Sequence, residues 1–255
     1  MALLKLPLTE GALDAQLTRV AQEGTSPMEF LARMIGDQAN RRRESGIARR
    51  IREAKFAEDC TLEGFDWDFN AKTIPRHEIE PLLQCDFLRR RESLILVGQS
   101  GLGKSRIIQA IGRAACVLGY RTRYVTSGGL IAELTAAMAD NTLAKRVKYY
   151  ARFDFLIIDE FAFDRAERLQ SRCAANLLYN VVNARTSSRS TAVVTNIEIR
   201  QWDTYIRDLA LCGAIRDRVV DRARIHTLTG KSYRLHRAEQ LNSPKRNSGG
   251  GDSNS

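Results

Sequence analysis

The chain has 255 residues, of which 44% are hydrophobic and 27% are charged, a composition typical of a globular protein with one core domain and a smaller accessory region. No run approaches the roughly 18 consecutive apolar residues of a membrane helix, and the first residues lack the basic and apolar regions of a signal peptide. The net charge of +10 favours a polyanionic partner, and nucleic acid is the commonest one.

Cysteine and histidine usage indicates a reducing compartment. The five cysteines are scattered and odd in number, without a CxxC pair, and the three histidines are isolated from one another. This pattern argues against a disulfide scaffold and against a zinc site, and it predicts a cytoplasmic protein.

The first region, residues 1–60, is predicted to be a small helical domain. Leu13, Leu17 and Val20 recur at helical spacing, and Ser26-Pro27 begins a second helix as a capping residue followed by proline in the first turn. The second helix has an apolar stripe, made of Phe30, Leu31, Met34 and Ile35. It then continues into a basic run, which consists of Arg41, Arg42, Arg43, Arg49, Arg50, Arg52 and Lys55.

Residues 61–91 are predicted to link this helical region to the core and to lie along the core's edge. Phe65, Trp67 and Phe69 alternate there with two aspartates, and a short helical pattern follows. We expect the three rings to seal the edge of the core. Stacking on nucleic-acid bases or on adenine is the alternative.

Residues 92–241 alternate β-rich and amphipathic helical segments. The β-rich runs are SLILV, RTRYV, FDFLIID and STAVVTN. Such alternation predicts an α/β fold in which helices cover both faces of a parallel sheet. The polar tail, residues 242–255, has nothing that could pack and is expected to be disordered.

The segment GQSGLGKS, Gly98 to Ser105, matches the phosphate-binding pattern GxxxxGK[ST], the Walker A motif of ATP-binding proteins. An apolar strand precedes it and an apolar helix follows, as that motif requires. The glycines let backbone N–H groups face the phosphates, while Lys104 is expected to reach the β- and γ-phosphates and Ser105 to ligate Mg²⁺. The predicted nucleotide-binding residues are Gly98, Gln99, Ser100, Gly101, Leu102, Gly103, Lys104, Ser105 and Arg106.

Two carboxylates follow four apolar residues in the run that ends at Asp159-Glu160, the expected Walker B position. We expect them at the carboxyl end of a strand neighbouring the P-loop strand, with Asp159 holding Mg²⁺ through water and Glu160 polarising the attacking water. A kinase, or a protein that binds ATP without hydrolysing it, needs no second carboxylate at this position. The Asp159-Glu160 pair therefore favours ATP hydrolysis. At the end of the next β-rich run, Asn196 is expected to orient that water near the γ-phosphate.

With these three elements, the chain resembles the IstB/DnaC-type AAA+ ATPases, and within them the IstB transposition helpers. The resemblance covers nearly the whole chain. Its motifs are RRIREAKF, TLEGFDWDF, GQSGLGKS, FLIIDEF, VVTN followed by Trp202, and AIRDRVVDRARIHTLTGKSYRL. Two departures are Ser105, where threonine is commoner, and the absence of the usual serine between Thr195 and Asn196.

The resemblance implies a homo-oligomer with ATP at subunit interfaces, where an arginine finger from the next subunit completes each site. The matching position is Arg218, with Arg216 and Arg222 as neighbours, and Arg234 is a candidate sensor arginine. The family also implies non-specific binding of duplex DNA, recruitment of a cognate transposase, and a bacterial protein that is nucleoid-associated when bound to DNA. The basic run from Arg41 to Lys55 then becomes a candidate for DNA phosphate contacts; subunit contacts or a solvated helix are the alternatives.

Three other functions fit parts of the sequence. A DnaC-like replicative helicase loader would have the same ATP site and a helicase as its partner. A small-molecule or nucleotide kinase shares the P-loop, but Asp159-Glu160 and the lack of a clear substrate lid disfavour it. A non-enzymatic DNA-binding module would be excluded by measurable ATP turnover.

Overall fold

The structure, a computed structural model, divides the chain into two compact units, residues 1–50 and residues 51–255. The described residues are 10–23, 26–57, 61–161, 173–186, 188–206 and 208–242, so that 243–255 of the predicted tail lie outside them. No helix in the described part of the chain is long and apolar enough to span a membrane.

The first unit is helical, as predicted. It contains α1 (Glu10–Glu23) and most of α2 (Pro27–Ala54), whose last residues belong to the second unit. The Ser26 Oγ accepts a hydrogen bond from the Glu29 backbone N–H across 3.3 Å, which confirms the predicted capping residue. Six of the seven residues of the basic run lie on α2, and Lys55 directly follows its last residue.

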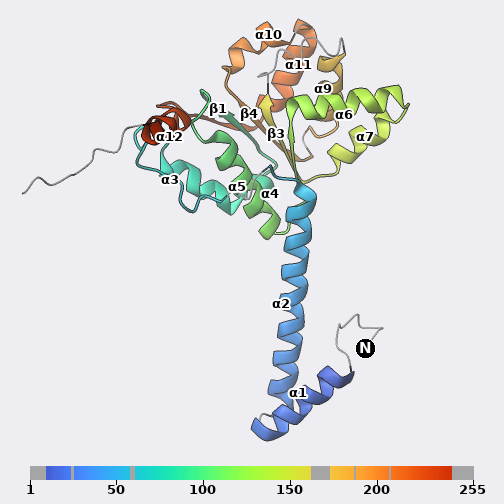
Figure 1. The fold of residues 1–255 in the computed structure, drawn as a ribbon. Coiled ribbons are helices and arrows are strands. Elements are labelled where there is room, and N and C mark those ends of the chain that lie inside the picture. Colours follow the sequence, from blue (N-terminus) through green and yellow to red (C-terminus); the bar gives the residue numbers. More distant parts are fainter. Residues whose placement is uncertain are drawn as a thin grey trace, which may run out of the picture. The chain divides into compact units, whose positions relative to one another are not determined.

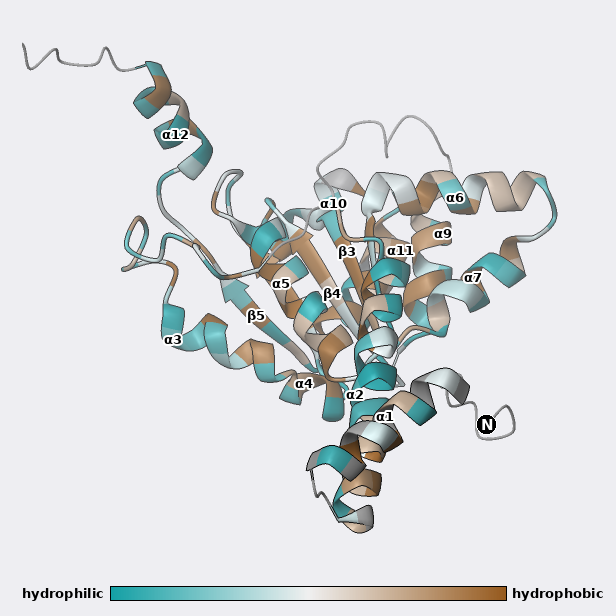
Figure 2. Cartoon of the chain, turned by 60° about the horizontal axis from the view of Figure 1, so that its bottom comes forward, coloured by the Kyte–Doolittle hydropathy of each residue, from teal (hydrophilic) through white to brown (hydrophobic). Residues whose placement is uncertain are grey.

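The predicted apolar stripe of α2 is only partly covered. Phe30 is buried, whereas Leu31 is 45% and Ile35 63% exposed. The charged side chains that follow make α2 largely hydrophilic (Figure 2).

Five parallel strands form one sheet in the second unit, in the order β2-β3-β4-β1-β5 (Figure 1). They are β1 (Ser93–Val97), β2 (Thr122–Thr126), β3 (Phe155–Phe161), β4 (Ser190–Thr195) and β5 (Ala223–Thr227). The first four coincide with the predicted β-rich runs and confirm the fold class. The fifth strand, β5, was not predicted. It lies at the edge of the sheet, none of its residues is fully buried, and its sequence ARIHT therefore lacks an apolar run.

Helices cover both faces of the sheet, as predicted (Figure 1). One face carries α5 (Lys104–Val117) and the short helices α3 (Arg76–Ile79), η1 (Glu80–Gln84) and α4 (Asp86–Arg89). The other carries α6 (Ser127–Ala139), α7 (Leu143–Ala151), α9 (Ala174–Asn183), α10 (Trp202–Tyr205) and α11 (Leu209–Val220). The remaining described helices are η2 (Ile199–Gln201) and α12 (Tyr233–Asn242).

Alternate residues along each central strand face two separate cores. On β1, Leu94 and Leu96 join the core under α5, where Ile107 is fully buried, while Ile95 joins the core under α6 with Leu130. A strand that is buried on both faces needs a continuous apolar run, which is why β1, β3 and β4 were recognisable in the sequence.

Residues 61–91 contribute buried side chains to the core of the second unit. Ile79 is fully buried in the core under α5. The Arg106 guanidinium on α5 donates to the backbone carbonyl oxygens of Thr61 (3.0 Å) and Glu63 (2.7 Å). This arginine therefore fixes the start of the segment against α5.

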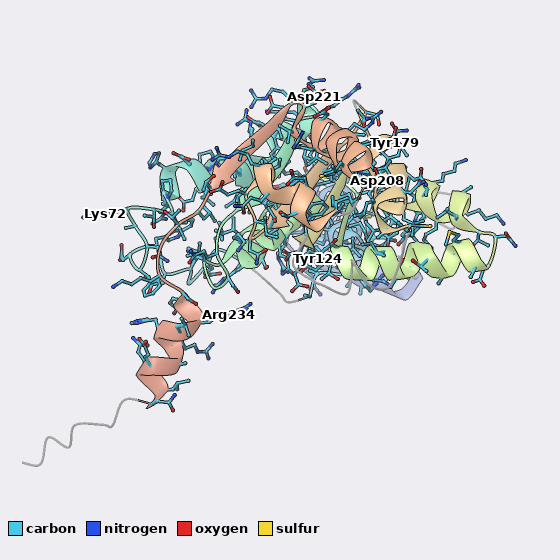
Figure 3. The ribbon with its side chains drawn as sticks, turned by 90° about the horizontal axis from the view of Figure 1, so that it is seen from above. Lys72, Tyr124, Tyr179, Asp208, Asp221 and Arg234 are labelled. Atoms are coloured by element: carbon cyan, nitrogen blue, oxygen red, sulfur yellow. The ribbon has the colours of Figure 1, made fainter. Side chains whose placement is uncertain are left out.

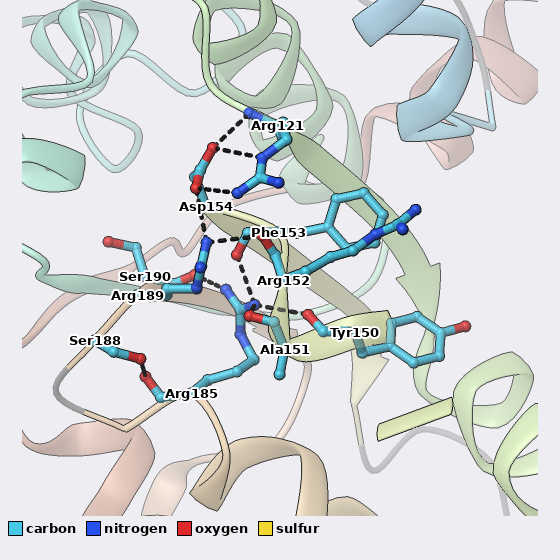
Figure 4. A network of polar contacts seen from close by, with 10 residues as sticks. All are labelled: Arg121, Tyr150, Ala151, Arg152, Phe153, Asp154, Arg185, Ser188, Arg189 and Ser190. Carbon is cyan, nitrogen blue, oxygen red and sulfur yellow. Dashed lines mark hydrogen bonds and ion pairs between the residues drawn. The ribbon is translucent and has the colours of Figure 1, made fainter. Parts of the chain in front are cut away.

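The buried side chain of Arg185 forms hydrogen bonds near the amino ends of β3 and β4 (Figure 4). The Arg185 Nη1 donates to the carbonyl oxygens of Tyr150 and Phe153, both at 2.8 Å, and its Nε donates to the Thr191 Oγ1 at 3.0 Å. The Arg185 Nη2 also donates to the Ser190 carbonyl oxygen. Burial lowers the pKa of Arg185 to about 9. These bonds tie the amino ends of β3 and β4 together, at the opposite ends of the strands from the P-loop.

Candidate functional site

The loop between β1 and α5 takes a backbone shape that requires glycine. Gly101 and Gly103 have φ angles of +86° and +81°. A Cβ atom on Gly101 would lie 2.0 Å from the Ser232 Oγ, and one on Gly103 would lie 2.8 Å from the Phe65 Cε2. The loop is thus packed closely against residues 61–91 on one side and against the segment before α12 on the other.

A pocket of about 390 Å³ lies over this loop, within the usual size range of small-molecule sites. Its walls come from the loop, the carboxyl ends of β3 and β4, residues 64–74 and α12. Eleven residues predicted to be functional line it: Ser100, Gly101, Leu102, Gly103, Lys104, Ser105, Arg106, Asp159, Glu160, Asn196 and the candidate sensor Arg234. Gly98 and Gln99 stand at the start of the loop, outside this lining.

Lys104 is buried at the start of α5 and points back across the loop. Its Nζ donates a hydrogen bond to the Gln99 carbonyl oxygen across 2.8 Å. Burial lowers the pKa of Lys104, the charge of Arg234 lowers it further, and the charge of Asp159 opposes both. The lysine, the aspartate and an arginine of α12 are therefore close enough to influence one another.

Asp159 and Glu160 have different surroundings at the end of β3. Asp159 is buried, and its Oδ1 accepts a hydrogen bond from the Glu160 backbone N–H at 2.8 Å. Glu160 is exposed and has a φ of +57°, and the register between β3 and β4 shifts there. Backbone strain of this kind in a residue other than glycine is uncommon and clusters at functional sites. The bulge places both carboxylates at the pocket.

The strand order corrects one prediction. β4 lies between β1 and β3, so the strand that ends in Asp159 is not the direct neighbour of the P-loop strand. The three strand ends still meet at the pocket because parallel strands finish at the same edge of the sheet. The Thr195 Oγ1 accepts a hydrogen bond from the Ile197 N–H at 3.1 Å, while Asn196 is exposed and lines the pocket.

The three aromatic residues that alternate with aspartates in the 61–91 segment, Phe65, Trp67 and Phe69, also line the pocket. Phe65 and Trp67 pack against the core under α5, and their ring centroids are 4.6 Å apart. Phe69 lies edge-on to Tyr233 of α12, with 5.3 Å between ring centroids. Phe65 and Trp67 therefore cover the edge of the core, as expected, and all three rings face the pocket; stacking on adenine or on nucleic-acid bases stays a prediction.

The C-terminal segment supplies two cations to the pocket, Arg234 and Arg237 of α12. Arg234 lies near the start of that helix (Figure 3). The Tyr233 N–H donates to the Gly101 carbonyl oxygen at 3.0 Å, which joins the start of α12 directly to the P-loop. Arg237 was not predicted. Arg237 follows Arg234 by three residues, and residues at that spacing share a helix face. Assigning a helix to the residues from Tyr233 on would therefore have indicated Arg237.

Arg218 lies on α11 and is not among the described residues that line the pocket. Its Nε donates to the Asn183 Oδ1 at 2.8 Å, and its guanidinium carbon lies 4.8 Å from the Tyr179 ring centroid. Arg222 lies beyond α11 and donates to the Arg90 carbonyl oxygen at 3.1 Å, while Arg216 is half-buried on α11. The chain therefore does not bring Arg218 to its own pocket.

The predicted DNA-binding residues lie on α2 and directly after it. The basic residues from Arg41 to Arg50 belong to the first unit, and Arg52 and Lys55 to the second. All are exposed except Arg50, which is half-buried. The helix thus displays a cationic surface.

A family model described as "IstB-like ATP binding protein" matches residues 1–241. Among curated relatives, the "Insertion sequence IS232 putative ATP-binding protein" of Bacillus thuringiensis subsp. berliner is 28% identical over 208 residues, which covers 82% of this chain and 81% of the relative. The equivalently named protein of insertion sequence IS5376 from Geobacillus stearothermophilus is 27% identical over 233 residues, or 91% of this chain and 90% of the relative.

Two solved structures share the fold. AMPPCP-bound DnaA from Aquifex aeolicus matches with a TM-score of 0.55 and 16% identity, covering 73% of this chain and 56% of that one. DnaI matches with a TM-score of 0.52 and 16% identity, covering 67% of this chain and 92% of that one. These likenesses confirm the predicted P-loop AAA+ fold.

Proposed function

Because the chain belongs to the family of IstB-like ATP-binding proteins, we propose that it is an ATPase that assembles on duplex DNA and assists a transposase in choosing its target. The observation that carries the proposal is the convergence of the glycine loop, Lys104, Ser105, Asp159 and Glu160 on one pocket. The insertion-sequence names of the relatives favour a transposase over a replicative helicase as the partner. We place the protein in the bacterial cytoplasm, on the nucleoid when it is bound to DNA.

The pocket suits a nucleoside triphosphate. The backbone N–H groups of the loop and of the first turn of α5 provide donors for phosphate oxygens, and Lys104 adds a cation. Phe65 and Trp67 offer flat apolar surfaces for a base at the other side of the pocket. A side chain on Gly101 would collide with Ser232 and one on Gly103 with Phe65, so the loop keeps the shape that presents its N–H groups only with glycine at both positions.

The donor set also suits Mg²⁺. The Ser105 hydroxyl and the Asp159 carboxylate are hard oxygen ligands, and Mg²⁺ in nucleotide sites takes one or two such groups together with phosphate oxygens and water. We assign both residues to hold the ion. When bound, Mg²⁺ neutralises the negative charge that gathers on the phosphate oxygens.

The chain's own groups can then perform the hydrolysis. Glu160 accepts a proton from the attacking water, whose oxygen bonds to the γ-phosphorus as the bond to the ADP oxygen breaks. Asn196 orients that water, and Lys104 stabilises the charge on the transferred phosphoryl group. We assign Arg218 to act from the neighbouring subunit, as the family resemblance implies, and its position outside the pocket of its own chain is compatible with that role.

Glu160→Gln should bind ATP with nearly unchanged affinity and hydrolyse it about 10²–10⁴ times more slowly, since the amide keeps the shape but accepts no proton. Binding of a fluorescent ATP analogue and single-turnover phosphate release measure the two effects. Glu198→Gln is a matched control, because Glu198 is exposed just beyond β4 and pairs with Arg200. Normal turnover by Glu160→Gln would remove the assigned base.

DNA binding should be electrostatic. With a net charge of +10 and an exposed basic helix, the affinity for duplex DNA should fall steeply with salt, with a logarithmic slope of about −0.9 per neutralised phosphate. The triple variant Arg41→Ala, Arg43→Ala, Arg49→Ala should flatten that slope by up to about three units, one per lost contact. Fluorescence anisotropy of a labelled duplex across a salt series measures both.

A second triple variant controls for charge alone. Arg76, Arg89 and Arg200 are exposed and each pairs with an acidic neighbour, so their replacement by alanine removes the same net charge elsewhere. We expect this variant to keep the wild-type slope. Equal flattening in both variants would show that total charge, not α2, governs binding.

ATP should control the DNA-bound state. We expect ATP to close the interface between subunits and thereby form a positively charged surface for DNA, and hydrolysis to release it. Equal DNA affinity with ATP, with ADP and without nucleotide would contradict this switch.

A further inference from the structure

The Asp159 carboxylate has a partner that the nucleotide-binding motifs do not include. Tyr124 lies on β2, and its hydroxyl donates to the Asp159 Oδ2 across 2.9 Å. Both side chains are buried, with 9% of Tyr124 and 1% of Asp159 exposed. Because the Glu160 N–H donates to Oδ1, each carboxylate oxygen receives one hydrogen bond from the chain and keeps lone-pair capacity for another ligand.

Packing holds the Tyr124 ring in place. It belongs to the core under α5, and its centroid lies 6.4 Å from that of Phe56. Phe56 occupies the space over Gly112, where a Cβ atom would lie 2.8 Å from the Phe56 Cε1. The next residue, Ala57, donates its N–H to the Gln109 Oε1 at 2.8 Å. The direction of the phenol is therefore fixed by the core.

The register explains why tyrosine suits this position. Thr126 is paired with Asp159, so Tyr124 stands two residues earlier, beside Ile157, and only a long side chain reaches the carboxylate from there. A lysine or arginine would neutralise Asp159 and compete with a cation. A phenol donates one hydrogen bond and leaves the negative charge available.

We propose that Tyr124 is a positioning residue of the magnesium site, which holds the Asp159 carboxylate in the orientation that Mg²⁺ binding requires. The inference rests on the proposed function, since it takes Asp159 as a holder of the ion. Hydrogen bonds to a charged acceptor are short and directional, and partners of metal-holding carboxylates commonly change metal affinity by 10–100-fold when they are removed.

The test is Tyr124→Phe in the full chain, which removes the hydroxyl and keeps the ring. Mg²⁺ is titrated against the protein with the fluorescent analogue mant-ATP. We expect the half-saturating Mg²⁺ concentration to rise by about tenfold, while mant-ATP affinity in EDTA stays at the wild-type value. An unchanged Mg²⁺ requirement, or an equal loss of affinity in EDTA, would overturn the proposal.

Tyr150→Phe is the matched control. The Tyr150 hydroxyl donates to the Glu133 Oε2 at 2.6 Å, so this variant also loses a phenol–carboxylate hydrogen bond, and neither residue lines the pocket. It should leave the Mg²⁺ requirement unchanged, and thermal unfolding of both variants reports any general loss of stability. A rise in the Mg²⁺ requirement equal to that of Tyr124→Phe would overturn the proposal.

A double-mutant cycle separates positioning from a structural role. In an Asp159→Asn background, Tyr124→Phe should change the Mg²⁺ requirement by less than twofold, because the carboxylate that it positions is gone. A tenfold effect that persists in that background would contradict the proposal. If the wild-type chain itself shows no Mg²⁺-dependent mant-ATP binding, the proposed function fails together with this inference; if only the Tyr124 result fails, the proposed function stands.

Discussion

Lys104→Ala should abolish ATP hydrolysis and nucleotide-dependent assembly. Lys104 is the lysine of the P-loop motif and is buried at the start of α5, where its charge interacts with that of Asp159. The arginines of α12 line the same pocket but come from another segment. Its Nζ already bonds to the Gln99 carbonyl oxygen, so the side chain is positioned across the loop before any phosphate arrives. The alanine variant leaves the glycine backbone intact and removes only this charge.

Phosphate release and mant-ATP binding measure the loss, and light scattering with ATP and duplex DNA measures assembly. Lys145→Ala is the control, because Lys145 is an exposed lysine on α7 that does not line the pocket. It should hydrolyse ATP at the wild-type rate. Normal turnover by Lys104→Ala would overturn the assignment of the site.

Arg218→Ala should slow hydrolysis by about a thousandfold or more in the assembled protein, the scale of an arginine finger. The guanidinium is held between the Asn183 amide and the Tyr179 ring, away from the pocket of its own chain. Because these contacts already fix the side chain, it loses little further conformational entropy when it contacts the γ-phosphate of a neighbouring subunit on assembly. ATP binding to the isolated subunit should stay unchanged, which separates this variant from Lys104→Ala.

The neighbouring arginines are the controls for this prediction. Arg222→Ala removes a guanidinium that bonds to the Arg90 carbonyl oxygen, and Arg216→Ala removes a half-buried one on α11. Both should keep turnover within about tenfold of wild type, well short of the loss expected for a finger. A normal rate for Arg218→Ala with a slow rate for either control would reassign the finger.

Local patterns in the sequence were enough to predict the strand, loop and helix around the P-loop. Their geometry depends on contiguous residues: an apolar run, glycines at positive φ and an apolar helical face. The same reasoning found the other two central strands that end at the pocket, because strands that are buried on both faces carry short apolar runs, LII in β3 and AVV in β4.

Features that depend on distant segments escaped that reasoning. The position of β4 between β1 and β3 is set by how the chain crosses the sheet, which no local pattern records. Tyr124 meets Asp159 only through the register of two strands, and Arg237 meets the pocket only because α12 returns to the P-loop. The edge strand β5 is polar enough to lack a strand pattern of its own.

A mixture of two inactive variants tests most directly whether the protein hydrolyses ATP at a site shared between subunits. Lys104→Ala keeps Arg218 but lacks a working pocket, whereas Arg218→Ala keeps the pocket but lacks the arginine. The two proteins are mixed before ATP, Mg²⁺ and duplex DNA are added, and phosphate release is followed. We predict that the mixture hydrolyses ATP although neither variant does so alone; a mixture as inactive as its components would contradict the shared site.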